Sequence, residues 1–212
     1  MTSYYFSVLR CTKCVAEFSV MNVASCNTIG AKFFTDGCVE GPMYDDGAAV
    51  LCCPGCSAYH WLDELAVIRD LDESEYFAGL ETDRLPRASR LRGDSYDDAL
   101  RQGAWSTPEQ EKYLRIRAWW HGNDRYRHGE NGDFALSVEQ TSNLLRLLEI
   151  LQTDDRIDPT SWIFRAEMLR ELGRFDESLA ILERDFEERF QPAVGVIRRL
   201  AKEGKRAVAE IG

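Results

Sequence analysis

The sequence predicts an α+β fold, in which a small β domain precedes a helical domain. All seven cysteines lie between residues 11 and 56, among short apolar runs interrupted by glycine. The second half of the chain instead has apolar residues at helical spacing behind recognisable helix start signals. These observations divide the chain into residues 1–68, residues 69–105 and residues 106–212.

Residues 1–68 are predicted to form strands joined by tight turns. Residues 1–10 have no basic region followed by a long apolar run, so we expect a first strand rather than a signal peptide. Asp36-Gly37 separates two apolar runs, and this dipeptide favours the positive φ of a hairpin turn. Further strands are predicted at residues 50–52 and 59–62.

Residues 69–105 are predicted to be a linker or exposed loop with short helices. Within this region, residues 84–93 are polar and basic and contain both Pro86 and Gly93. Proline and glycine are the residues that most often interrupt regular structure.

Residues 106–212 are predicted to form about five helices with short connections. Helix starts are expected at Thr107-Pro108, at Ser137 and at Asp158-Pro159, because each places a capping residue at the start of a helical pattern. One helix face is predicted from Phe175, Leu179, Leu182, Phe186 and Phe190, and a last helix from Ile197, Leu200, Ala201, Val208 and Ile211.

The strongest chemical signal is a pair of Cys-x2-Cys motifs. Cys11 and Cys14 form the first pair, and Cys53 and Cys56 form the second. This spacing lets one tight turn direct two thiolates at a point, and two such turns complete a tetrahedral site. Thiolate ligands in this geometry favour zinc, with an iron–sulfur centre as the competitor. Four cysteines also leave no open position, so the predicted zinc is structural.

The two motifs resemble the zinc ribbon family, in which two such turns, each on a β-hairpin, hold one zinc ion. The resemblance covers about the first 65 residues. The gap between the motifs exceeds the ~15–20 residues of the compact pattern, which indicates an insertion containing the Asp36-Gly37 hairpin. The whole plan also resembles uncharacterised bacterial proteins that pair a ribbon with a helical tail, and this resemblance implies no activity.

The remaining cysteines and one histidine leave alternatives open. Cys26, Cys38 and Cys52 are expected to be small buried apolar residues, since free cysteine commonly behaves that way. A Cys26–Cys38 disulfide is the alternative for that pair, and a reducing compartment disfavours it. His60 is expected to be partly exposed beside Trp61, with substitution for a cysteine ligand as its alternative. Residues 27–43 are interpreted as turn structure or as a partner-binding surface.

Residues 159–192 resemble one tetratricopeptide repeat. Trp162, Ala166, Gly173 and Phe175 occupy the characteristic positions, whereas Arg165 departs from an apolar position of the pattern. Stable arrays need about three repeats, so one repeat predicts a small repeat-like helical domain. The resemblance implies a groove that binds peptides or partner proteins.

Residues 115–128 mix arginine, aromatic residues and histidine. Such a mixture can bind phosphate or single-stranded nucleic acid. The preferred interpretation is a helix with Ile116, Trp119 and Trp120 in the core, ending at Gly122-Asn123.

The sequence favours a non-catalytic, cytoplasmic, zinc-binding protein–protein interaction module: an adaptor, a regulatory subunit or an inhibitor. The net charge is -10 and neither half is basic, which argues against a nucleic-acid partner. No run approaches the roughly 20 apolar residues that span a membrane. The sequence contains no glycine-rich phosphate loop, GxSxG motif or HExxH motif. Two alternatives remain: a nucleic-acid-associated ribbon protein in transcription or translation, and a metal- or thiol-dependent enzyme.

Overall fold

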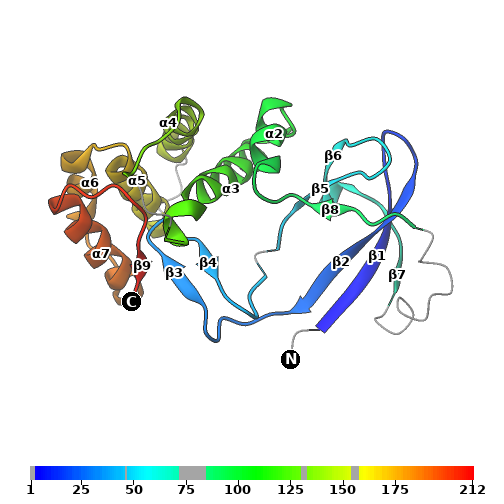
Figure 1. Ribbon diagram of the computed structural model, residues 1–212, viewed down its shortest axis with the longest axis horizontal. Helices are drawn as coiled ribbons and strands as arrows, with labels where there is room; N and C mark the ends of the chain where they lie inside the picture. Colours follow the sequence, from blue (N-terminus) through cyan, green and yellow to red (C-terminus); the bar gives the residue numbers. More distant parts are fainter. Residues whose placement is uncertain (1–2, 46, 72–84, 130–132, 154–157) are drawn as a thin grey trace. The chain divides into compact units, whose positions relative to one another are not determined.

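The computed structural model has the predicted α+β architecture, with small antiparallel sheets followed along the chain by helices (Figure 1). It describes residues 3–45, 47–71, 85–129, 133–153 and 158–212. The chain forms two compact units. Unit 1 comprises Met1–Ala31, Gly41–Ser95 and Arg101–Ala104, and unit 2 comprises Lys32–Glu40, Tyr96–Leu100 and Trp105–Gly212.

The first sheet of unit 1 has the strand order β2-β1-β7. Strand β1 (Ser3–Arg10) pairs antiparallel with both β2 (Glu17–Ser25) and β7 (Val67–Leu71). Strand β1 confirms the prediction that the chain begins with a strand. Because β1 and β2 are joined through residues 11–16, their hairpin presents the first cysteine pair at its turn.

The second sheet of unit 1 has the order β6-β5-β8. Strands β5 (Val50–Cys52) and β6 (Tyr59–Trp61) confirm the two predicted strands, and the second cysteine pair lies between them. Strand β8 (Ser89–Arg90) pairs with β5, and the neighbouring Ala88 and Leu91 are buried. Ser89 and Arg90 therefore belong to a sheet, whereas an exposed loop was expected there. Residues 72–84 of the expected linker lie outside the described residues.

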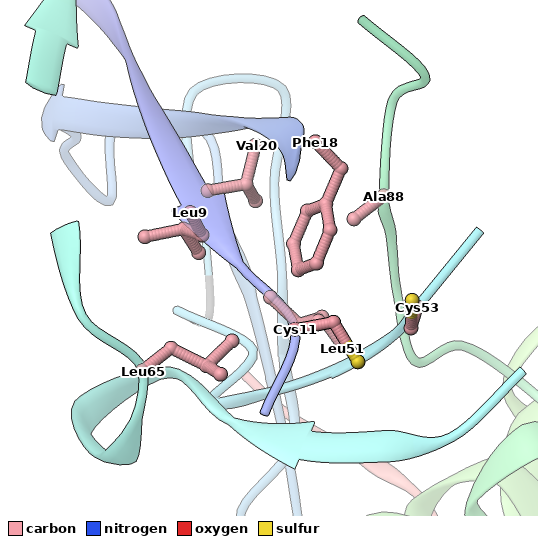
Figure 2. Close-up of a cluster of buried hydrophobic side chains, with 8 residues drawn as sticks. All are labelled: Leu9, Cys11, Phe18, Val20, Leu51, Cys53, Leu65 and Ala88. Carbon is pink, nitrogen blue, oxygen red and sulfur yellow. The ribbon is translucent and has the colours of Figure 1, made fainter. Parts of the chain in front are cut away.

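The core of unit 1 lies beside the cysteines (Figure 2). Side chains from both sheets and from the loops that follow them meet around Cys11 and Cys53. Fully burying one large side chain of this kind contributes about 1.5–3 kcal/mol. The apolar members of the cluster are Leu9, Phe18, Val20, Leu51, Leu65 and Ala88.

The Asp36-Gly37 hairpin has the predicted form and belongs to unit 2. Strands β3 (Lys32–Phe34) and β4 (Val39–Glu40) pair antiparallel, and Gly37 has φ 81°. The other edge of β3 pairs with β9 (Glu210–Ile211), near the end of the chain. Val208 and Ile211 are therefore not part of the last helix, so that prediction was wrong.

Five α-helices follow residue 106 in the described residues, as predicted. Helix α3 begins after a Thr107 capping box, and Asp158 caps α5. Ser137 and Gln140 exchange hydrogen bonds of 2.8 and 3.1 Å at the start of α4. No helix in the described part of the chain is long and apolar enough to cross a membrane. The helices are α2 (Ser95–Arg101), α3 (Pro108–Arg127), α4 (Val138–Thr153), α5 (Pro159–Glu171), α6 (Phe175–Leu182) and α7 (Gln191–Lys202), with 3-10 turns η1 (Leu62–Glu64) and η3 (Glu188–Phe190).

Two predicted helix ends were wrong. Helix α3 continues through Gly122-Asn123, because the Asn123 side chain is buried and hydrogen-bonded inside unit 2. Helix α6 ends at Leu182, so Phe186 and Phe190 do not share its face. Phe186 nevertheless packs with Leu182 in one apolar cluster, because the chain turns back beyond the helix end.

Helices α5 and α6 form the expected helix–turn–helix pair. Gly173 lies in the turn with φ 78°, a conformation that glycine adopts without steric cost. Ala166 and Ser178 are fully buried at the contact, where the Ser178 hydroxyl donates to the Ala166 carbonyl at 2.7 Å. Small side chains at these two positions let the helices approach closely.

Candidate metal centre

The two Cys-x2-Cys turns of unit 1 have the same backbone structure. In the first turn the Cys11 N–H donates to the Ala16 carbonyl at 2.9 Å, and the Val15 N–H donates to the Cys11 carbonyl at 3.0 Å. The second turn repeats both bonds at 2.9 Å, from Cys53 to Ala58 and from Ser57 to Cys53. Two loops of different sequence thus converge on one conformation.

The residue after each cysteine pair is left-handed. Val15 has φ 56° and Ser57 has φ 57°, and neither is glycine. This conformation costs roughly 1–2 kcal/mol for such residues, so the surrounding structure must impose it. Its occurrence at both equivalent positions indicates that the turns are shaped to aim their sulfur atoms.

The four predicted ligands come together. The sulfur atoms of Cys11, Cys14, Cys53 and Cys56 all lie within 4.8 Å of one another. The Cys11–Cys56 and Cys14–Cys53 sulfur distances are both 3.7 Å, and all seven cysteines are free thiols. A tetrahedron with zinc–sulfur bonds of about 2.3 Å has edges of about 3.8 Å. The cluster therefore has the size and the donor set of a tetrahedral metal site.

Backbone N–H groups point at the sulfur atoms. The N–H groups of Lys13 and Cys14 lie 3.3 and 3.4 Å from the Cys11 sulfur. Gly55 N–H lies 3.4 Å from the Cys53 sulfur. Donors so placed stabilise thiolate charge, and four thiolates around one divalent cation leave excess negative charge to stabilise.

His60 contacts the cluster from outside. Its side chain is buried, with the residue 7% exposed, whereas the sequence predicted partial exposure. Its Nε2 atom lies 3.2 Å from the Cys11 sulfur. The group of mutually close ligand atoms contains the four cysteines and not His60. His60 is therefore a neighbour of the predicted ligand Cys11.

The thiols of the cluster differ in acidity. Burial acts to raise the pKa of Cys11, but the N–H groups of Cys14 and Lys13 outweigh it and lower the pKa to about 6. For Cys14 the Ala16 backbone lowers the pKa, yet the Cys11 sulfur and burial raise it overall to about 12. At neutral pH the metal-free cluster thus combines a thiolate with protonated thiol, and binding a cation displaces protons.

The other three cysteines lie outside the cluster. Cys52 is half-buried, and its sulfur approaches the Cys53 carbonyl at 3.9 Å. Cys38 is half-buried in unit 2, where burial raises its pKa to about 12. Cys26 is exposed, so the prediction that it is buried was wrong. The alternative Cys26–Cys38 disulfide is not formed, since both are free.

Unit 2 contains a buried charged cluster that the sequence did not reveal. The Asp36 side chain is fully buried, pairs with Arg127 and accepts from the Asn123 amide at 3.0 Å. Glu167 pairs with Arg170, and both side chains are fully buried. From the sequence, the Asp36-Gly37 dipeptide predicts only a hairpin turn. The residues next to Asp36 give no sign that distant helices supply the partners of its carboxylate.

Glu171 completes this cluster, and its carboxyl group takes its hydrogen bonds from neutral side chains. It accepts from the Trp119 indole at 2.8 Å and from the Asn123 amide at 2.9 Å, both neutral groups. Burial, followed by the charges of Glu167 and Asp36, holds the pKa of Glu171 well above its usual range. With a proton on Glu171, the two remaining carboxylates, Asp36 and Glu167, match the charges of Arg127 and Arg170.

The arginine-rich stretch at residues 115–128 is largely engaged within unit 2. Trp119 is buried and Ile116 and Trp120 pack beside it, as predicted for a core-facing helix. Arg115 donates to Glu111 at 2.9 Å, and Arg127 is paired with Asp36. These guanidinium groups are occupied by internal carboxylates.

Neither a protein-family model, nor a curated protein, nor a solved structure matches this chain. The function must therefore be inferred from the chemistry of its own residues.

Proposed function

We propose that unit 1 is a zinc ribbon holding one structural zinc ion and that the protein is a non-catalytic protein–protein interaction module. The observation that carries this proposal is the four-sulfur cluster of Cys11, Cys14, Cys53 and Cys56. Four protein ligands fill a tetrahedral coordination sphere, whereas catalytic zinc sites keep one position for water or substrate.

Zinc suits this cluster better than hard divalent cations such as magnesium and calcium do. Thiolate sulfur is a soft ligand, and a tetrahedral four-sulfur set selects zinc or iron over magnesium and calcium. A zinc ion here joins the β1–β2 and β5–β6 hairpins, whose shared apolar core is small. In domains of this size metal binding supplies part of the folding free energy.

The interaction role rests on unit 2. Helices α5 and α6 pair through Ala166 and Ser178, and α7 packs against both of them. This arrangement is similar to tetratricopeptide-type stacking. Such stacks present extended surfaces to partner proteins. The acidic chain, with net charge -10, suits a protein partner better than a nucleic acid.

Elemental analysis and cobalt substitution test the metal proposal. We expect one zinc per chain and, after exchange, the visible spectrum of tetrahedral cobalt with four thiolates. A spectrum of water-bound cobalt would contradict the closed site and would reopen the possibility of an enzyme, whereas a nitrogen-ligated spectrum would contradict the four-cysteine ligand set.

Affinity purification from native lysate, with and without nuclease, tests the interaction proposal. A stoichiometric protein partner that survives nuclease is the expected result. Partners that disappear on nuclease treatment would favour the nucleic-acid-associated alternative, and the absence of any partner would count against an interaction module.

A further inference from the structure

Two arginines converge on one tryptophan in the helix pair of unit 2. The guanidinium carbon of Arg165, from α5, lies 4.3 Å from the centre of the Trp162 ring. The guanidinium carbon of Arg184, just beyond α6, lies 3.7 Å from the same ring centre. Both charges therefore lie against the Trp162 ring, a contact that fixes planar guanidinium groups in place.

Neither guanidinium has an acidic partner among the described residues. The flanking residues Glu183 and Asp185 form no ion pair with Arg184, and the Arg165 Nε–H is buried without a hydrogen-bond acceptor. Other arginines of unit 2 pair with a carboxylate, as Arg127 does with Asp36, or donate to a backbone carbonyl, as Arg198 does to Leu182. Within the described residues, the Arg165 and Arg184 side chains do neither.

The pair also carries an internal electrostatic cost. Burial, and then the charge of Arg184, lower the pKa of Arg165. A buried donor without an acceptor costs free energy as well. An oxyanion beside the two guanidinium groups would offset the repulsion between their charges. Arg165 also occupies a position where the repeat pattern has an apolar residue, so helix packing does not explain its presence.

We propose that Arg165, Arg184 and Trp162 form a binding site for a carboxylate of an acidic segment in a partner protein. Guanidinium groups bind carboxylates through paired N–H donors, and the Trp162 ring holds both groups in place. A short acidic segment is favoured over a long polyanion, because a chain of net charge -10 repels the whole length of a nucleic acid or an anionic membrane but only the few charges of a short segment. This inference names the partner chemistry of the proposed interaction function and rests on it.

Titration of the full-length protein with a labelled glutamate-rich peptide tests the site. We expect binding that weakens with salt and a shift of the Trp162 indole N–H resonance, assigned with Trp162→Phe. The double variant Arg165→Gln/Arg184→Gln should lower the affinity about tenfold. The matched control is Arg174→Gln/Arg189→Gln, which removes two exposed arginines already paired with Glu177 and Glu187 and should leave the affinity unchanged.

Three results would overturn the proposal. They are equal binding by the wild-type protein and the Arg165→Gln/Arg184→Gln variant, absence of binding by the glutamate peptide, and binding by a phosphoserine peptide but not by the glutamate peptide. Far-UV circular dichroism of the double variant verifies that its helices remain folded.

The lysate experiment distinguishes this site from the interaction function as a whole. A stoichiometric partner retained by the double variant, together with failure of the peptide titration, would discard the arginine site and leave the interaction function standing. Loss of that partner from the double variant, but not from the control variant, would support both.

Discussion

The Nε2 atom of His60 lies 3.2 Å from the sulfur of Cys11, a predicted metal ligand that also receives two backbone N–H groups. A thiolate can only accept hydrogen bonds, so a deprotonated Cys11 requires the proton of a neutral imidazole to be on Nε2. His60 is thereby placed to hold the Cys11 sulfur and to stabilise its charge from outside the four-sulfur cluster.

Removing this donor should weaken zinc binding. Partners of metal ligands typically contribute 10–100-fold to metal affinity, so we expect His60→Phe to lower zinc affinity by about tenfold or more. His60→Gln, which can present an N–H at similar reach, should restore much of it. Competition with a chelator of known affinity measures the effect, and unchanged affinity in His60→Phe would contradict the assigned role.

Two adjacent cysteines should behave oppositely on substitution. Cys53→Ser removes a ligand and should abolish stoichiometric zinc binding, whereas Cys52→Ser lies outside the cluster and should retain one zinc per chain. The neighbouring positions make this a matched pair, with elemental analysis as the readout. Zinc retained by Cys53→Ser would show that the site does not need Cys53.

Removing zinc should unfold residues 1–31 and 41–65 of unit 1 and spare unit 2, which includes the hairpin at residues 32–40. Trp61 is buried in unit 1, where its indole donates to the Ala104 carbonyl at 2.9 Å, while Trp119 is buried in unit 2. Addition of chelator should therefore collapse the Trp61 indole resonance and leave that of Trp119. A Trp61 resonance that persists in metal-free protein would contradict a structural role for the metal.

Glu171 should make unit 2 less stable as pH rises. Its folded pKa is raised above the usual 4.5, so the folded state keeps a proton that the unfolded state releases. This contribution to stability is complete below pH 4.5 and is lost as pH rises towards the folded pKa, with a slope of up to about 1.4 kcal/mol per pH unit. Glu171→Gln should reduce the slope in urea unfolding followed by circular dichroism.

A second glutamate provides the comparison for this pH dependence. Glu177 is exposed and paired with Arg174, and the side-chain hydrogen bond from Arg174 lowers its pKa. Glu177→Gln should therefore leave the decline of stability above about pH 5 unchanged. Equal slopes in the wild type and Glu171→Gln would mean that Glu171 is ionised in the folded protein.

Gly37 should be far less tolerant of substitution than Gly204. Both have positive φ, but a Cβ on Gly37 would collide with the ring of Phe164, whereas nothing lies near a Cβ on Gly204. Gly204→Ala should cost about 1–2 kcal/mol of backbone strain. Gly37→Ala should add about 1–3 kcal/mol for the overpacked ring. Equal unfolding free energies for the two variants would exclude that contact.

The sequence by itself determined the features that depend on neighbouring residues. The x2 spacing of the cysteine pairs, the Asp36-Gly37 turn and the Thr107 and Asp158 caps each depend on hydrogen bonds or φ values within a few positions. Local geometry is therefore enough to predict which four cysteines come together and where most helices start.

Tertiary structure alone decided which segments share a core. The hairpin between the cysteine pairs belongs with the helices, because Asp36 finds Arg127 and Asn123 there, and β9 completes the sheet on β3. The approach of His60 to Cys11, and of Arg165 and Arg184 to Trp162, likewise depends on packing between segments. Periodicity identifies a buried face but not the residue it will meet, since that choice is made by the packing of the whole unit.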